Sequence, residues 1–140
     1  MIARQATAVA IGNRAVLIEG EPAAGKSVLA LALIDRGAEL IGDDGVLLAP
    51  AGNRLLARPH PTTRGLIEVR NLGLLRFPVR EEAPVALVLR LDEAAPRFVE
   101  EAERIEIAGH ALPLIRLWPG GTILPLKAEQ ALLRYGLFPS

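Results

Sequence analysis

Short apolar runs, separated by glycine and proline, follow one another along this chain and predict many strands around few helices. Residues 6–11 and 15–19 form two such runs, and the turn residues Gly12-Asn13-Arg14 between them predict a hairpin. Further strands are expected at residues 39–41, 46–48, 55–57, 66–70, 85–91 and 105–107.

Two longer segments have the spacing of helices. Residues 27–36 carry apolar side chains on almost every face, so we expect a largely buried helix that Gly37 closes. Residues 126–135 have helical periodicity before the stop signal Gly136, and residues 97–103 are a weaker candidate for a short helix. The pattern predicts a single α/β domain, rich in strands, over residues 1–140.

Composition and charge narrow the classes of partner. The 140 residues include 16 basic and 16 acidic side chains, so no excess positive field favours nucleic acid or an anionic membrane. The absence of cysteine excludes disulfides and thiolate metal sites. No apolar run approaches the roughly 20 residues of a membrane span, and we expect a cytoplasmic protein.

The segment between the second expected strand and the first expected helix carries the most specific motif. It fits the phosphate-binding pattern G-x-x-x-x-G-K-[ST] with Gly20, Glu21, Pro22, Ala23, Ala24, Gly25, Lys26 and Ser27. Its glycines let main-chain N–H groups and the helix N-terminus face a polyphosphate. Lys26 can reach the β- and γ-phosphates, and the Ser27 hydroxyl can reach Mg²⁺. The segment therefore predicts binding of a nucleoside triphosphate.

Asp43 and Asp44 are the best candidates for the chemistry of transfer. They end the strand expected after the first helix, and in a parallel arrangement that strand end lies on the same rim as the phosphate loop. One carboxylate can polarise Mg²⁺ or its water while the other accepts a proton from an attacking hydroxyl. The run Asp43-Asp44-Gly45 equally fits an ordinary turn between strands, and spacing alone leaves both interpretations open.

Residues 20–27, the helix end at 34–37 and the segment 40–44 together resemble the catalytic domain of the bacterial HPr kinase/phosphorylase family. Residues 67–75 are similar to that family's signature, [IL]-E-x-R-G-L-G-[IL]-[IL]. The similarity covers about half the chain. It implies a β-rich P-loop kinase domain of the HPr kinase / PEP carboxykinase-like type, as in short single-domain alphaproteobacterial members, and a homohexamer.

The resemblance also implies an activity, namely transfer of phosphate from ATP to a serine of an HPr-like phosphocarrier of a phosphotransferase regulatory system. Lys26 would grip the transferred group, and Ser27 and Glu68 would hold Mg²⁺. Asp44, beside Asp43, would act as general base on the serine hydroxyl.

Arg97 falls where the family places a catalytic arginine. From the residues alone, Arg97 also fits a solvated surface arginine. Glu68 likewise fits the polar face of a half-exposed strand, because polar and apolar residues alternate around it.

Three departures from the family pattern bear on the activity. Gln5 stands where a histidine is common, and it cannot carry a proton near neutral pH, which leaves reverse phosphorolysis weak or absent. Pro22 offers no N–H to phosphate, and Ala23 does not easily adopt glycine angles. Asn71 replaces a glycine, a mild change because Asn tolerates a left-handed conformation.

Two other functions remain open from the sequence. The chain fits a nucleotide-binding sensor that has lost turnover, and it also fits a small-molecule phosphotransferase on the same scaffold. The residues Lys26, Ser27, Asp43, Asp44 and Glu68 favour an active enzyme over the sensor.

Overall fold

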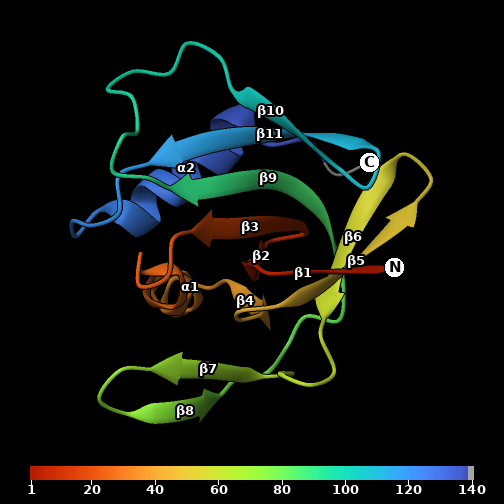
Figure 1. Ribbon diagram of the computed structural model, residues 1–140, viewed down its shortest axis with the longest axis vertical. Helices are drawn as coiled ribbons and strands as arrows, with labels where there is room; N and C mark the ends of the chain where they lie inside the picture. Colours follow the sequence, from red (N-terminus) through yellow and green to blue (C-terminus); the bar gives the residue numbers. More distant parts are fainter. Residues whose placement is uncertain (139–140) are drawn as a thin grey trace.

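The computed structural model describes residues 1–138 (Figure 1). Its elements are β1 (Ile2–Arg4), β2 (Thr7–Ile11), β3 (Arg14–Gly20), α1 (Lys26–Asp35), β4 (Glu39–Gly42), β5 (Val46–Ala51), β6 (Arg54–Pro59), β7 (Leu66–Val69), β8 (Gly73–Arg76), β9 (Ala83–Leu91), β10 (Glu103–Ile107), β11 (His110–Leu117) and α2 (Leu124–Tyr135). No helix in this part of the chain is both long and apolar enough to cross a bilayer.

One large sheet forms the body of the molecule, in the order β1-β5-β6-β9-β3-β2-β4. β9 pairs in parallel with β3 and with β11, and β10 joins β11 as a hairpin. β2 runs antiparallel to both β3 and β4, so β3 and β4 point the same way. β7 and β8 form a separate hairpin, at the bottom of the view in Figure 1.

The central strands are buried on both faces, which explains their nearly continuous apolar sequences. On one face, side chains such as Val16, Ile18 and Leu89 pack with residues of α1 and α2. On the other face, Leu17 and Val88 pack with residues of β5, β6, β10 and β11, because the sheet folds over itself. The phosphate-binding motif therefore directly follows a strand at the centre of the core.

Most of the expected elements are confirmed, with bounds that move by a few residues. The hairpin of β2 and β3 turns at Gly12, whose φ of 62° suits glycine. β1 and β8 were not expected, since each is short and mostly exposed.

Two expectations about helices are wrong. Residues 97–103 form no helix, because pairing with β11 draws the segment from Glu103 into β10. The first helix is not buried on all sides: Leu29, Ala30 and Leu33 face the core, whereas Val28 is 69% exposed. The helix carries apolar residues on more of its surface than its packing partners cover.

Replacing Leu89 by alanine should lower the free energy of unfolding by about 2–5 kcal/mol, because the lost side chain leaves a cavity beside a strand that is packed on both faces. Leu74→Ala makes the same change on a side chain that is 66% exposed, and it should cost less than about 1 kcal/mol. Urea denaturation measures both, and equal losses would contradict this description of the core.

Candidate functional site

The phosphate-binding loop joins the end of β3 to the start of α1, as the motif predicts. A Cβ at Gly20 would lie 3.1 Å from the Leu91 carbonyl oxygen and 3.2 Å from Ala24 Cβ, so the close approach of the backbone favours glycine. Ala23 adopts a φ of 65°, a left-handed conformation that costs a non-glycine residue about 1–2 kcal/mol. The loop therefore forms despite its unusual residues, at some cost in strain.

The loop presents its positive groups at one end of α1. The Lys26 ammonium donates to the carbonyl oxygens of Gly20, at 2.7 Å, and of Glu21, at 3.2 Å. No side chain caps the N-terminus of α1, and its first turn has no acidic residue. Both features suit an anion, because phosphate forms stronger, charge-assisted bonds with an ammonium than carbonyls do.

Asp43 lies at the centre of a buried hydrogen-bonded cluster next to this loop. Its Oδ1 accepts from the Ser27 hydroxyl at 2.7 Å and from the Thr7 hydroxyl at 2.9 Å. Asp43 is 7% exposed and Thr7 is 1% exposed. The expected position of Asp43, on the same rim of the sheet as the phosphate loop, is thus confirmed. The hydrogen bond from Ser27 joins Asp43 directly to the motif.

Asp44 is exposed, unlike its neighbour, and lies at a sharp reversal of the chain. A Cβ at Gly42 would come within 2.6 Å of the Gly45 carbonyl oxygen, so the turn closes tightly. Asp44 has a φ of 58°, which aspartate tolerates better than most residues. The turn and catalytic interpretations are compatible, since the turn separates a buried carboxylate from an exposed one.

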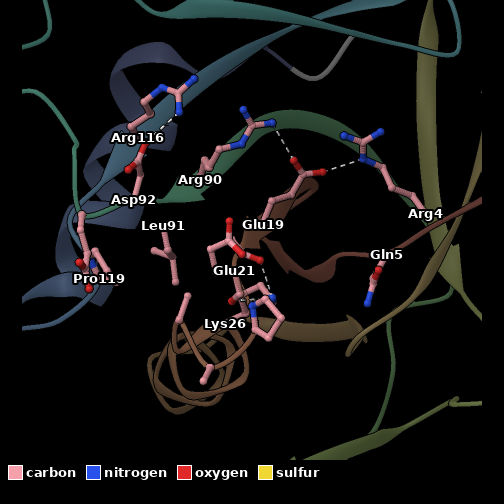
Figure 2. Close-up of a pocket in the computed structure, with 15 residues that line it drawn as sticks. Arg4, Gln5, Glu19, Glu21, Lys26, Arg90, Leu91, Asp92, Arg116 and Pro119 are labelled. Atoms are coloured by element: carbon pink, nitrogen blue, oxygen red, sulfur yellow. Dashed lines mark hydrogen bonds and ion pairs between the residues drawn. The ribbon is translucent and has the colours of Figure 1, made fainter.

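A cavity of about 960 Å³ opens beside the loop (Figure 2). Glu19 of β3 lies in its wall between two arginines, 2.6 Å from Arg4 Nε and 3.1 Å from Arg90 Nη2. Gln5 also lines this cavity, together with residues of the phosphate loop that include Lys26. The cavity is therefore walled by paired charges and reaches the phosphate-binding groups.

A second ionic cluster supports the far wall of the cavity. Arg116 of β11 donates to Asp92 Oδ2 at 2.9 Å and to Glu103 Oε2 at 2.7 Å. The hydrogen bond to Arg116 is the main cause that holds the pKa of Glu103 below its usual value. The pKa of Asp92 is also lowered, first by the Ala94 N–H and then by Arg116.

Glu68 and Arg97 are not brought to the cavity. Glu68 is exposed on β7, whose neighbouring Ile67 is fully buried, in the alternation expected of a strand. Arg97 lies in the loop after β9, exposed, with its guanidinium carbon 5.4 Å from the ring centroid of Phe98. It lines a separate hollow of about 500 Å³, and Arg116 lines both hollows.

The sequence assigned no role to Thr7 and did not predict the arginine clusters. Thr7 carried a usable signal, since it is the one hydroxyl in the apolar run of β2. Arg4, Glu19 and Arg90 gave none, because their pairing depends on which strands become neighbours.

The oxygens at this site fit Mg²⁺. Mg²⁺ takes one or two carboxylates together with phosphate and water, so it needs no dense cluster of protein ligands. Ser27 Oγ and the Asp43 carboxylate supply hard oxygen donors beside the phosphate loop. Among residues 1–138, no group of three or more His, Cys, Asp and Glu side chains is positioned to hold a metal. A metal here would therefore depend on the nucleotide for its remaining ligands.

A phosphate loop after a central strand, the helix that it opens and an adjacent strand ending in two carboxylates define a P-loop kinase type of domain. The sequence profile of the HPr Serine kinase C-terminal domain matches residues 2–117, and the chain belongs to this family.

Comparisons with individual proteins agree. The HPr kinase/phosphorylase of Chromobacterium violaceum is 34% identical over 125 residues, which is 84% of this chain and 39% of that protein. The HPr kinase/phosphorylase of Mycoplasma mycoides is 34% identical over 97 residues, 64% of this chain and 31% of that one. The chain thus spans between 31% and 39% of the length of these curated relatives.

The fold matches a solved structure of the same kind. The structure of the Hpr(Ser) kinase/phosphatase from Coxiella burnetii superposes with a TM-score of 0.86 and 28% identity, covering 95% of this chain and 89% of that one. The expected fold class, a β-rich α/β domain of the HPr kinase type, is confirmed.

The contacts of Arg116 with Glu103 and Asp92 predict how the stability of the fold depends on pH. A carboxylate with a lowered pKa stabilises the fold above its ordinary pKa, and this contribution is lost as the pH falls through the lowered value. Arg116→Gln should raise the pKa of Glu103 back toward 4.5 and raise that of Asp92 by less. It should therefore reduce the loss of stability between about pH 4.5 and lower pH. Carboxyl ¹³C NMR titration and acid denaturation measure the two effects.

Arg104→Gln is the matched control, since it removes an equal charge from the exposed neighbour of Glu103 on β10. Successive residues of a strand face opposite ways, so Arg104→Gln should leave the pKa of Glu103 nearly unchanged. Equal shifts in both variants would mean that overall charge, and not the Arg116 contact, sets these pKa values.

Proposed function

We propose that this chain is an ATP-dependent protein-serine kinase domain that acts in the cytoplasm on an HPr-like phosphocarrier. One observation carries the proposal: the 2.7 Å hydrogen bond between Ser27 and Asp43 joins the phosphate loop to the carboxylate pair. The exposed Asp44 follows directly, at the position that a protein acceptor can reach. The family match supports the choice of a carrier as substrate.

In the proposed phosphoryl transfer, some residues bind the nucleotide and its metal, and another accepts the proton of the serine. Lys26 exchanges its carbonyl partners for the β- and γ-phosphates, and Ser27 and Asp43 hold Mg²⁺. The metal, when bound, neutralises charge on the phosphate oxygens. The serine oxygen of the carrier attacks the γ-phosphorus, the bond to the β–γ bridging oxygen breaks, and ADP leaves. An Asp44 carboxylate oxygen takes the serine proton late in this step.

In the proposed function, Glu68 and Arg97 act from the periphery of the site. Both belong to peripheral segments, the β7–β8 hairpin and the loop after β9, and both are exposed. Glu68 would add an oxygen ligand to Mg²⁺, and Arg97 would neutralise charge on the transferred group. Each role requires its segment to approach the phosphate loop when ATP and carrier bind.

A nucleotide sensor is the second candidate, and the placement of Arg97 outside the cavity favours it. Purified chain incubated with ATP, Mg²⁺ and the HPr-like protein of its own organism separates the two. Formation of phosphoserine supports the kinase, whereas tight ATP binding without transfer supports the sensor.

Asp44→Asn should lower kcat for carrier phosphorylation by about 10²–10⁴-fold, because the amide cannot accept the serine proton. ATP binding should be unchanged, since Asp44 is absent from the proposed phosphate and metal contacts. Asp35→Asn makes the same change at the exposed end of α1 and should leave both quantities unaltered. Full activity in Asp44→Asn would eliminate this residue as the base. Radiolabelled phosphate transfer and calorimetry provide the measurements.

The wild-type chain should release little pyrophosphate when phosphorylated carrier is mixed with inorganic phosphate, because Gln5 cannot shuttle a proton. Gln5 lines the cavity, so Gln5→His should increase the rate of this reverse reaction. Gln130→His, on the exposed side of α2, is the control and should not. Rapid release by the wild-type chain would show that the reaction needs no histidine at this position.

A further inference from the structure

We propose that Thr7 is a positioning residue that sets the geometry of both Asp43 and Asp44 for phosphoryl transfer. This inference rests on the proposed function and extends it to a residue on β2 that neither the phosphate-binding motif nor the carboxylate pair includes. Its basis is a hydrogen-bonding arrangement in which one buried hydroxyl contacts both members of the pair.

Thr7 and Asp43 are the two buried polar or charged side chains among residues 1–138, and they are bonded to each other. A buried hydroxyl costs free energy unless it is hydrogen-bonded, and valine would fill the same volume without that cost. If packing in β2 were the only requirement at position 7, valine would satisfy it. The hydroxyl is explained by its partners and not by the core.

The Thr7 hydroxyl makes contacts in two directions. It donates its single proton to Asp43 Oδ1 at 2.9 Å, so its lone pairs remain for donors. The Asp44 backbone N–H points to Thr7 Oγ1 with an N···O distance of 3.5 Å, which is a long contact. One atom thus orients the Asp43 carboxylate and lies against the Asp44 backbone where φ is 58°.

The local backbone gives this oxygen a fixed position. Thr7 lies opposite Ile18 of β3 in the sheet, and its branched Cβ restricts the rotation of the side chain. On the other side, the pairing of β2 with β4 shifts register between Ala8 and Val9. Such irregularities redirect a strand end, here the end that carries the aspartates.

Thr7 also differs from Ser27, the other donor to Asp43 Oδ1. Ser27 belongs to the phosphate loop, and in the proposed function its oxygen also binds Mg²⁺. Thr7 contacts neither phosphate nor metal in that scheme. It is therefore the partner that holds Asp43 in the same place whether or not nucleotide is bound.

The test compares three variants in carrier phosphorylation. Thr7→Val keeps the shape of the side chain and removes the hydroxyl, so kcat should fall by about 10- to 100-fold. Thr7→Ser restores the hydroxyl and should recover most of kcat. Thr63→Val is the control: it removes the hydroxyl of a half-buried threonine outside the cavity, which has no hydrogen-bond partner among the described residues, and it should leave kcat unaltered.

A double-mutant cycle separates positioning from general damage to the fold. In an Asp43→Ala background the Thr7→Val loss should shrink to less than about threefold, because the oxygen atom to which Thr7 donates is already absent. An equal fold-loss in both backgrounds overturns the proposal, as does full kcat in Thr7→Val. Should Thr7→Val fail to fold, Thr7→Cys replaces it, and its weaker donor should give an intermediate kcat.

A crystal structure of Thr7→Val gives a readout that does not depend on activity. We expect the Asp43 carboxylate to lose its contact with β2 and Asp44 to leave the left-handed region. An unchanged aspartate pair overturns the proposal even if the wild-type chain proves inactive on the carrier. Inactivity of the wild-type chain, combined with a displaced pair in the variant, refutes only the proposed function.

Discussion

The carboxylate of Asp43 is the point at which three separate parts of the chain are held together. Ser27 approaches it from α1, Thr7 approaches it from β2, and Asp43 itself directly follows β4. A carboxylate this well buried requires hydrogen bonds to offset its lost hydration, and both donors serve that need. The position of the phosphate loop relative to the aspartates is therefore fixed by an energetic requirement of the core.

Strand order makes this convergence possible. β3 and β4 point the same way although neither pairs with the other, because β2 lies between them and is antiparallel to both. The loop after β3 and the turn after β4 consequently open on one rim, separated by the width of a single strand. Thr7 lies on that intervening strand, which is why a residue there can contact Asp43 directly.

The sequence predicted those features that depend on neighbours along the chain, and it failed where distant partners decide. The phosphate loop, the hairpin at Gly12 and the helix after Lys26 follow from local residue types and spacing. The Thr7–Asp43 and Glu19–Arg90 contacts join residues 36 and 71 positions apart, and periodicity does not specify which strands meet. The helix expected at residues 97–103 was lost for the same reason, to pairing with β11.

The two halves of the proposed site differ in how firmly they are held. Lys26 and Ser27 begin a helix packed on the central sheet, and Asp43 directly follows β4, so in the proposed function ATP would bind without rearrangement of the core. Glu68 and Arg97 lie on exposed segments at the periphery. In the proposed function, transfer would thus need a movement of these segments that binding does not need. Contacts with the carrier would be the natural source of the free energy for that movement. Such an arrangement would couple the chemistry to the presence of the acceptor and limit wasteful transfer to water.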